Sequence, residues 1–371
     1  MRRLLVFLFL STHAFGAFSY YRTLTIDHTK CGSANSSSFP VLVSINHSSF
    51  KTVANGGRVQ NSNGYDIIFT SDSGGTTKIP WEVESYDGTT GVLVAWVNIP
   101  SVSHTTDTVF YVWYGGASIS TAQNTGSYSP ENVWDANYKG VWHLTSLNIN
   151  DSTSNAHNGS LIGNPTATTG KIGGGMAVTG SNRTDVSSPI AGNYFDVSTD
   201  FGSTTVMAEF WLYLIGGTHR GIMASGPNNG VPALAVSINS DNRLDAFRGS
   251  DTTTTNPLST GVWIHAVIVN DGSNTLYYLN GSLSNSAAQT ITPAMQSTFH
   301  VGANYWGSFE GSIDEFRISN SVRSDSWVLT SYNNQNAPGN IGADNFLKYG
   351  AENTPPPPAG GMIRHRVIGG E

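Results

Sequence analysis

The chain has 371 residues, which is enough for two domains of ordinary size with appended segments. Only 12% of the residues are charged, and Gly, Ser, Thr and Asn are abundant, so the composition is typical of an extracellular all-β protein and argues against a helical cytosolic enzyme. The net charge of −7 leaves no basic face to replace counterions, which argues against nucleic acid and against an anionic membrane surface as partners.

The first 16 residues have the features of a secretory signal peptide. Arg2 and Arg3 precede the apolar run 4–10, and small residues follow at Ala14 and Gly16, after which we expect cleavage. The apolar run is too short to cross a bilayer as a helix, and no later stretch is a transmembrane candidate. We therefore expect a secreted protein that is extracellular or held at the cell surface.

Residues 17–125 form the first predicted unit, an antiparallel β-sandwich. Short runs rich in β-branched and aromatic residues are separated by turn residues, and none has helical periodicity. Cys31 is the one cysteine of the chain, so the fold rests on packing rather than on an intrachain disulfide. We expect a half-buried thiol at Cys31, with an intermolecular bridge as the alternative, and core positions for Trp81, Trp96 and Trp113. The strand-like runs are 20–26, 39–45, 66–70, 79–86, 91–97 and 108–114.

Four motifs of this unit resemble a known family. They are S-N-G-Y-D-I-I-F-T-S-D at 62–72, P-W-E-V-E-S-Y-D at 80–87, A-W-V-N-I-P at 95–100 and V-W-Y-G at 112–115. Together they resemble DUF2341, a domain of unknown function that often stands directly before a laminin-G-like domain in secreted proteins. The resemblance covers nearly all of residues 18–125 and implies no biochemical activity.

Glu82 and Glu84 lie on one face of the strand predicted at 79–86. Two carboxylates on one face are the groups that an acid/base pair needs. Because the sequence predicts no other acid opposite them, we expect a solvated sheet face instead.

Residues 132–340 form the second predicted unit, after a polar connector at 116–134. Asn280-Gly281 is a strong signal for a two-residue hairpin turn. The closing run 309–318 alternates apolar and polar residues as a half-buried strand does, and Ser324 or Asp325 can cap a short helix over 324–333. Other strand-like runs are 205–213, 233–238, 244–247, 262–269 and 275–279.

The second unit also resembles a family. Its motifs are W-H-L at 142–144, D-S-T-S-N-x-H-N-G at 151–159, G-K-I-G-G-G-M at 170–176 and F-x-G-x-I-D-E-x-R-I at 309–318. They are similar to those of the laminin-G-like, concanavalin A-like jelly-roll domains of secreted proteins. The chain is thus predicted to be all-β, an antiparallel sandwich followed by a two-sheet jelly roll whose first and closing strands lie near each other. This fold hosts binding modules, enzymes and spacers alike.

Residues 341–371 are predicted to be a proline-rich linker and a basic tail. Four prolines at 355–358 favour an extended spacer. We expect the last ten residues to be disordered, with a docking or sorting peptide as the alternative.

A structural calcium ion is the cofactor that the laminin-G resemblance implies. Asp151, in a loop rich in Asn, Ser and Gly, and Asp314, in the closing strand, match the positions of the ligating aspartates in that family. Carboxylate and carbonyl oxygens suit Ca²⁺. The alternative is that Asp151 caps a turn and Asp314 pairs with Arg317.

The sequence offers no catalytic constellation. Glycoside hydrolysis needs two facing carboxyl groups about 5–10 Å apart. Glu209 stands alone, and Asp314 and Glu315 are adjacent, so we expect them on opposite faces of their strand. The histidines are scattered, without a zinc-binding motif.

Exposed aromatic residues with polar neighbours are the usual groups for binding carbohydrate. Tyr305 and Trp306 lie in a loop between two strand-like runs, and His219 and Arg220 form a second, weaker candidate. The alternative for the first pair is a packed hairpin tip.

We therefore expect a secreted, non-catalytic recognition or adhesion protein that binds a glycan or a protein surface through the second unit. The alternatives are a structural spacer at a cell surface or on a virion, and a glycoside hydrolase or lyase. Two acids that face each other in one groove would favour the enzyme.

Overall fold

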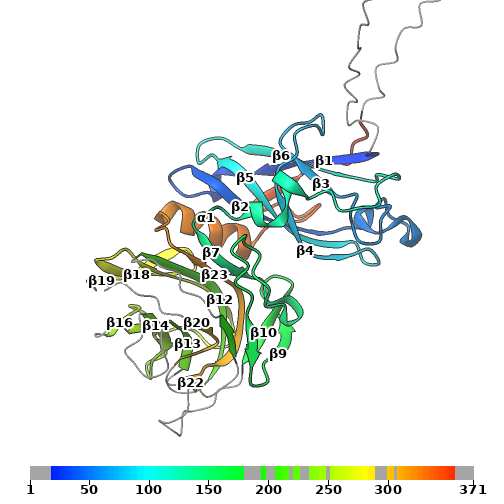
Figure 1. Cartoon of the computed structure of the whole chain (residues 1–371). Helices are drawn as coiled ribbons and strands as arrows, with labels where there is room; N and C mark the ends of the chain where they lie inside the picture. Colours follow the sequence, from blue (N-terminus) through cyan, green and yellow to red (C-terminus); the bar gives the residue numbers. More distant parts are fainter. Residues whose placement is uncertain are drawn as a thin grey trace, which may run out of the picture.

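The structure is a computed structural model of the chain. It describes residues 18–178, 194–197, 205–216, 220–225, 234–247, 251–288, 299–304 and 307–355, and the predicted signal peptide lies outside them. The described residues form two β-sandwiches, short 3-10 turns and one α-helix, α1 (Asp325–Asn336), which lies between the sandwiches in Figure 1. The predicted all-β class is confirmed. In the part of the chain that is described, no helix is long and apolar enough to cross a membrane.

The first sandwich packs a four-stranded sheet of order β24-β1-β6-β3 against a three-stranded sheet of order β2-β5-β4. All pairs are antiparallel, and the inward side chains of both sheets make one apolar core. The first six strands coincide with the predicted runs, apart from their ends. They are β1 (Tyr20–Ile26), β2 (Ser36–Asn46), β3 (Ile68–Thr70), β4 (Trp81–Asp87), β5 (Val92–Val102) and β6 (Thr108–Tyr114).

The chain returns to the first sandwich after it has built the second. β24 (Leu347–Tyr349) pairs with β1, so that Leu24 lies opposite Tyr349, and Phe346 is fully buried in the first core. The structure therefore corrects the prediction that 341–371 is a linker and tail: its first part is an edge strand and a core segment. Three residues are too few to show a strand period, which is why the sequence did not indicate it.

Glu352 fastens this returning segment. Its carboxylate accepts a hydrogen bond of 2.8 Å from the Tyr114 hydroxyl and lies 3.8 Å from the Arg22 guanidinium. An isolated bridge joins Tyr21 to Asn353, so the two ends of the described chain leave the first sandwich side by side. In Figure 1 this end of the first sandwich lies away from the second.

The described strands of the second sandwich form two sheets. The eight-stranded sheet has the order β19-β18-β17-β12-β23-β10-β9, and β7 also pairs with β23. The nine-stranded sheet has the order β16-β15-β14-β13-β20-β11-β8, with the short β21 and β22 beside β13. The strands are β7 (Tyr138–Trp142), β8 (Ser160–Ile162), β9 (Thr166–Thr169), β10 (Gly174–Val178), β11 (Tyr194–Val197), β12 (Val206–Gly216), β13 (Arg220–Ser225), β14 (Leu234–Ile238), β15 (Leu244–Phe247), β16 (Asp251–Thr253), β17 (Trp263–Asn270), β18 (Asn274–Leu279), β19 (Ser282–Ala288), β20 (Phe299–Val301), β21 (Ala303–Asn304), β22 (Gly307–Ser308) and β23 (Glu310–Ser319).

The first strand of this domain closes it, as the resemblance implied. β7 pairs with β23 so that Trp142 lies opposite Phe316. The hairpin turn between β18 and β19 is at Asn280 and Gly281, both with positive φ, as predicted. Ser324 is the cap of α1, since its side chain accepts a hydrogen bond from the Trp327 amide.

α1 and the first sandwich cover part of the outer face of the eight-stranded sheet. The Trp211 indole donates to Gln335 of α1 at 2.8 Å, while the Leu42 amide of β2 donates to Asn334 on the same helix at 2.7 Å. As a result β23 is buried on both faces after its first residue. The prediction of a half-buried closing strand is corrected: its alternating polar residues face the other domain rather than solvent.

Candidate functional site

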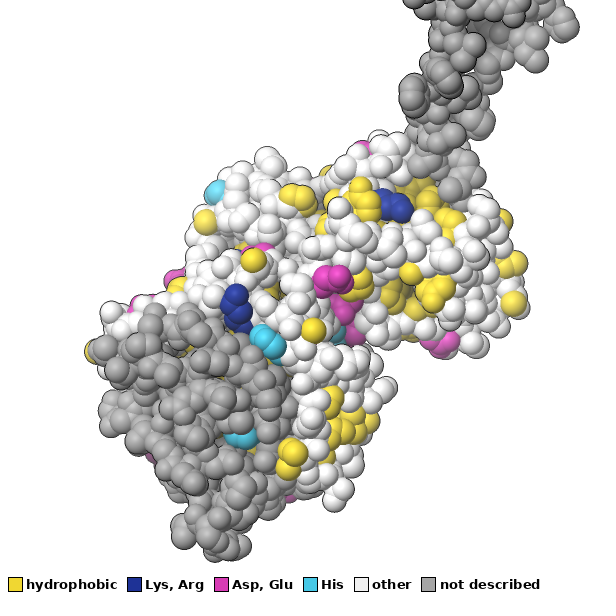
Figure 2. All heavy atoms as spheres, viewed as in Figure 1, with side chains coloured by type: hydrophobic (Ala, Val, Ile, Leu, Met, Phe, Trp, Pro, Cys, Tyr) yellow, Lys and Arg dark blue, Asp and Glu magenta, His cyan; other side chains and the backbone are white. Residues whose placement is uncertain are grey.

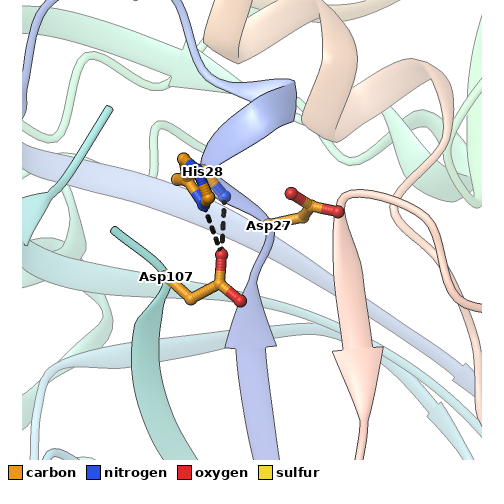
Figure 3. A group of neighbouring side chains, drawn as sticks. All are labelled: Asp27, His28 and Asp107. Atoms are coloured by element: carbon orange, nitrogen blue, oxygen red, sulfur yellow. Dashed lines mark hydrogen bonds and ion pairs between the residues drawn. The ribbon is translucent and has the colours of Figure 1, made fainter. Parts of the chain in front are cut away.

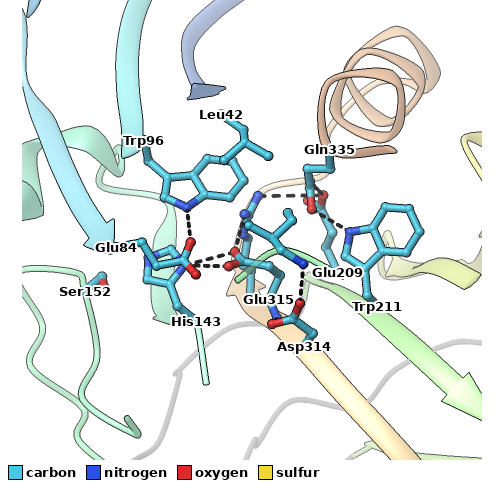
Figure 4. A network of polar contacts seen from close by, with 12 residues as sticks. Leu42, Glu84, Trp96, His143, Ser152, Glu209, Trp211, Asp314, Glu315 and Gln335 are labelled. Carbon is cyan, nitrogen blue, oxygen red and sulfur yellow. Dashed lines mark hydrogen bonds and ion pairs between the residues drawn. The ribbon is translucent and has the colours of Figure 1, made fainter. Parts of the chain in front are cut away.

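A cluster of ionisable side chains is buried where the two sandwiches meet (Figure 4). β4 contributes two of them, His143 follows β7, and the others lie on β12 and β23 of the eight-stranded sheet. We call this group the interface cluster. It consists of Glu82, Glu84, His143, Glu209, Asp314, Glu315 and Arg317.

His143 joins the acids of the two domains. Its Nδ1 lies 2.8 Å from a Glu315 oxygen, and its Nε2 lies 3.3 Å from a Glu82 oxygen. Burial by itself lowers the pKa of His143, but the charges of Glu315 and Glu82 outweigh it and hold that pKa well above its usual value. The imidazole is therefore a cation between carboxylates of both domains.

Glu84 is a buried acid whose pKa is raised. Its carboxylate accepts hydrogen bonds from the Trp96 indole at 3.1 Å and from the Thr145 hydroxyl at 2.8 Å, and its side chain is only 2% exposed. Burial, together with the negative charge of Glu315, raises the pKa of Glu84 to about 8. This carboxyl group therefore keeps its proton at neutral pH.

A β-bulge places Asp314 and Glu315 on the same face of β23. The register against β12 shifts between Glu209 and Trp211, and Glu315 has a φ of 52°. The prediction that these adjacent acids point to opposite faces is wrong, because the extra residue of a bulge interrupts the alternation. Burial and the charge of Glu315 raise the pKa of Asp314 well above its usual value.

Arg317 balances the acids of the second domain. Its guanidinium donates to Glu315 at 2.6 Å and lies over the rings of Trp96, at 4.2 Å, and Trp134, at 5.0 Å. Glu209 accepts a hydrogen bond from His265 at 3.0 Å; burial would raise its pKa, but His265 and Arg317 lower it to about 2. Arg317 of the second domain therefore contacts both an acid of its own domain, Glu315, and an aromatic ring of the first domain, Trp96.

The interface cluster holds the domains together rather than facing solvent. Glu82 accepts hydrogen bonds from the Trp134 indole and the Ser152 hydroxyl, at 2.9 and 2.6 Å. This corrects the prediction of a solvated face at Glu82 and Glu84, whose opposing groups come from the second domain. Ligand atoms of Glu84, His143 and Glu315 lie within 4.8 Å of one another, which is metal-binding spacing, yet each already has a partner in the chain.

A second group with this spacing lies on the first sandwich (Figure 3). The Asp107 carboxylate lies 2.7 Å from the His28 imidazole, and Asp27 lies 2.9 Å from Lys348. A hydrogen bond from the Thr29 hydroxyl is the main cause that lowers the pKa of Asp27 to about 2. The group is partly exposed, and its acids already have partners within the chain.

The two predicted calcium ligands have separate surroundings. Asp151 accepts hydrogen bonds from the amides of Val141 and His157, at 3.0 and 2.8 Å, and so fixes its loop. Asp314 accepts hydrogen bonds from the amides of Ile172 and Glu315. These donors occupy oxygens that calcium would need, so the described residues do not fit the ion without loss of these bonds. Calcium binding stays a prediction.

The predicted ligand-binding residues Tyr305, Trp306 and His219 lie outside the described residues, and of Arg220 only the backbone is described. The strands beside them are neighbours. β21 and β22 form the hairpin on either side of Tyr305-Trp306, and β22 pairs in parallel with the start of β13, where Ser308 lies opposite Gly221. The strand that follows Tyr305-Trp306 and the strand that begins at Arg220 therefore meet at one corner of the nine-stranded sheet.

Two family models match the chain, in the order expected. Residues 63–131 match the domain of unknown function DUF2341, and residues 191–329 match the concanavalin A-like lectin/glucanases superfamily. The second match covers strands of both sheets of the second sandwich.

The second domain is a concanavalin A-like jelly roll.

Solved structures similar to the chain include domain 4 of an extracellular arabinanase from Geobacillus stearothermophilus, in complex with arabinotriose. It is 19% identical, with 54% of this chain and 99% of that one covered and a TM-score of 0.42. The binding domain of Paraclostridial Mosquitocidal Protein 1 is 16% identical, with 53% of this chain and 52% of that one covered and a TM-score of 0.43. The chain thus spans about half the length of the toxin domain, and at these TM-scores neither likeness bears on function. No curated protein matches the chain.

An aromatic pair on the jelly roll was not predicted from the sequence. Tyr213 of β12 and Trp263 of β17 lie opposite each other, with ring centroids 5.6 Å apart, and both are partly exposed. Both residues lie in runs that were predicted as strands, in which alternate side chains are expected to point to the surface. The strand pairing that brings the two rings together is not visible in the sequence.

Proposed function

We propose that this is a secreted, non-catalytic recognition or adhesion protein that binds carbohydrate or a protein surface through its jelly roll. The observation that carries the proposal is the pairing of β22 with β13 at Ser308 and Gly221. It supports one binding corner that draws on the strands next to both stretches predicted from the sequence.

In the described chain, the acids that lie near one another at His143 are buried, which supports a non-catalytic role. Glu84 and Glu315 approach the same imidazole, but the Glu84 side chain is 2% exposed and that of Glu315 is fully buried. A polysaccharide cannot reach carboxylates that are sealed between two domains. Figure 2 shows few charged side chains on the face in view, with acidic ones where the two domains meet.

The experiment is equilibrium binding of the mature chain to an array of glycans and extracellular proteins, repeated with Trp306→Ala and Arg220→Ala. Tyr111→Ala, which changes a half-buried aromatic residue on the first sandwich, is the matched control. We expect saturable binding that both jelly-roll variants weaken and the control retains. Saturable binding that the jelly-roll variants leave unchanged would contradict the corner, and no binding at all would contradict recognition.

A structural spacer is the second candidate, and the buried domain interface favours it. A rigid connection between domains is what a spacer needs, and His143, Glu82 and Glu315 supply one. The predicted attachment segment is the C-terminal tail. Deletion of residues 354–371 should then release the protein from its surface; unchanged attachment would remove this candidate.

A further inference from the structure

The outer face of the eight-stranded sheet continues beyond the domain interface. Along β12, inward residues such as Phe210 and Leu212 belong to the jelly-roll core, so the alternate residues point outward. The outward side chains next to α1 are buried, but Tyr213 is partly exposed and Ile215 is 59% exposed. An apolar sheet surface that begins under α1 therefore extends into solvent.

Tyr213 and Trp263 form the centre of this open surface. They are register partners on β12 and β17, and their ring planes are inclined by 58°. The neighbour of Tyr213 on the other side, on β23, is Ser312, whose side chain is small. Among the printed register partners in the described chain, the two rings therefore lie beside a small side chain on the β23 side.

Polar groups border the rings on the side of α1. Lys171 lies 4.7 Å over the ring of Trp211, the outward residue that precedes Tyr213 on β12. The same ammonium donates to the Asn336 side-chain oxygen at 2.9 Å, and Asn336 is exposed at the end of α1. An ammonium and a side-chain amide thus lie at the rim of the domain interface, beside the open surface.

We propose that Tyr213 and Trp263 form a carbohydrate-stacking subsite, with Lys171 and Asn336 as hydrogen-bonding groups at its edge. The proposal rests on the proposed function and names a carbohydrate as the ligand. A sugar ring has an apolar C–H face that packs on aromatic rings, and hydroxyl groups that need donors and acceptors around it. An acyl chain would remove the Lys171 ammonium and the exposed Asn336 amide from water and offer them no hydrogen bonds beyond the one that joins them. The net charge of −7 opposes a polyanion such as nucleic acid.

The test measures the affinity of the full mature chain for labelled hexasaccharides of glucose, N-acetylglucosamine and arabinose. Trp263→Ala and Tyr213→Ala remove the rings, and Ile215→Glu adds a charge beside them at an exposed position that does not affect packing. Trp263→Phe keeps a ring. Tyr111→Ala is the control, because Tyr111 is a similarly exposed aromatic residue on the other domain. Thermal melting checks that each variant is folded.

We expect the two alanine variants and Ile215→Glu to weaken binding about tenfold or more, since central aromatic contacts carry much of a binding energy. Trp263→Phe should keep most of the affinity and Tyr111→Ala all of it. Equal affinity in folded Ile215→Glu and Trp263→Ala would overturn the subsite. Trp306→Ala and Arg220→Ala are measured with the same hexasaccharides, and if only these two variants lose binding, the subsite fails and the proposed function stands. If no hexasaccharide binds, the subsite fails for these sugars and is withdrawn, and the array of glycans and extracellular proteins still tests the proposed function.

Discussion

The carboxylate of Glu82 in the first domain lies 3.3 Å from the imidazole of His143 in the second. Both side chains are at least 85% buried, so this ion pair belongs to the interior of the molecule. The other imidazole nitrogen contacts Glu315 of the jelly roll, which holds His143 in its own domain. The jelly roll therefore cannot rotate relative to the first sandwich without separating His143 from Glu82. The two domains are therefore expected to unfold together.

His143→Ala tests this interface. The variant leaves Glu82 and Glu315 without their shared cation, and the loss of one partner from a buried charged pair costs about 3–5 kcal/mol. Urea unfolding should show this loss and a split into two transitions. His28→Ala is the control, because it removes an exposed histidine that also pairs with an acid, Asp107, and should change stability little. Equal effects of the two variants would contradict an interface role for His143.

The stability of the protein should fall as pH rises from 5 to 8. Burial and the charge of Glu315 raise the pKa of Glu84 from 4.5 to about 8, so the folded chain binds more protons than the unfolded chain between these values. The contribution of Glu84 to the free energy of unfolding is fully present below pH 4.5 and is lost as the pH approaches 8. The raised pKa of His143 acts in the same direction. The lowered pKa of Glu209, about 2, acts oppositely below pH 4.5, so we expect a maximum near pH 5.

Glu84→Gln keeps the shape of the side chain and removes its proton equilibrium. Free energies of unfolding at pH 5, 6.5 and 8 should decline less in this variant than in the native protein. Asp87→Asn, at an exposed position at the end of the same strand, should keep the native slope. The explanation would be wrong if stability rose from pH 5 to pH 8.

Truncation should show that the returning segment belongs to the first domain. A chain that ends at residue 340 lacks Phe346, Leu347 and Tyr349, whose burial contributes about 5 kcal/mol or more in total. It should melt at a markedly lower temperature or aggregate through the edge of β1 that it exposes. A chain that ends at residue 355 is the control and should match the full chain. Equal melting of the two truncated chains would refute the role of β24.

Calcium remains a prediction from the family resemblance. If Asp151 and Asp314 bind the ion, millimolar calcium should raise the melting temperature, because a ligand that binds only the folded state stabilises it. Asp151→Asn should abolish that rise. A melting temperature that is the same with calcium and with a chelator would withdraw both residues as ligands.

Most of the sandwich strands could be predicted, because their apolar periods of two residues are local. The interface could not be predicted for two physical reasons. The bulge at Glu315 depends on pairing with β12, so strict alternation assigned Asp314 and Glu315 to opposite faces. The faces of Glu82 and Glu84 were expected to be solvated because their partners lie in another domain.

Two further features also depend on contacts between segments that are distant in the sequence. β24 is three residues long and is a strand only because β1 offers it an edge. The subsite of Tyr213 and Trp263 needs the register of β12 against β17. By contrast, the cap at Ser324 and the turn at Asn280 are local and were predicted correctly.

The most direct test of the central claim is a binding isotherm of the mature chain on an array of glycans and extracellular proteins, read beside a sample with Trp306, Arg220 and Trp263 all changed to alanine. Recognition by the jelly roll predicts saturable binding by the native chain to at least one ligand and its loss in a variant that melts normally. Saturable binding that survives in the triple variant, or no binding by the native chain, would contradict the claim.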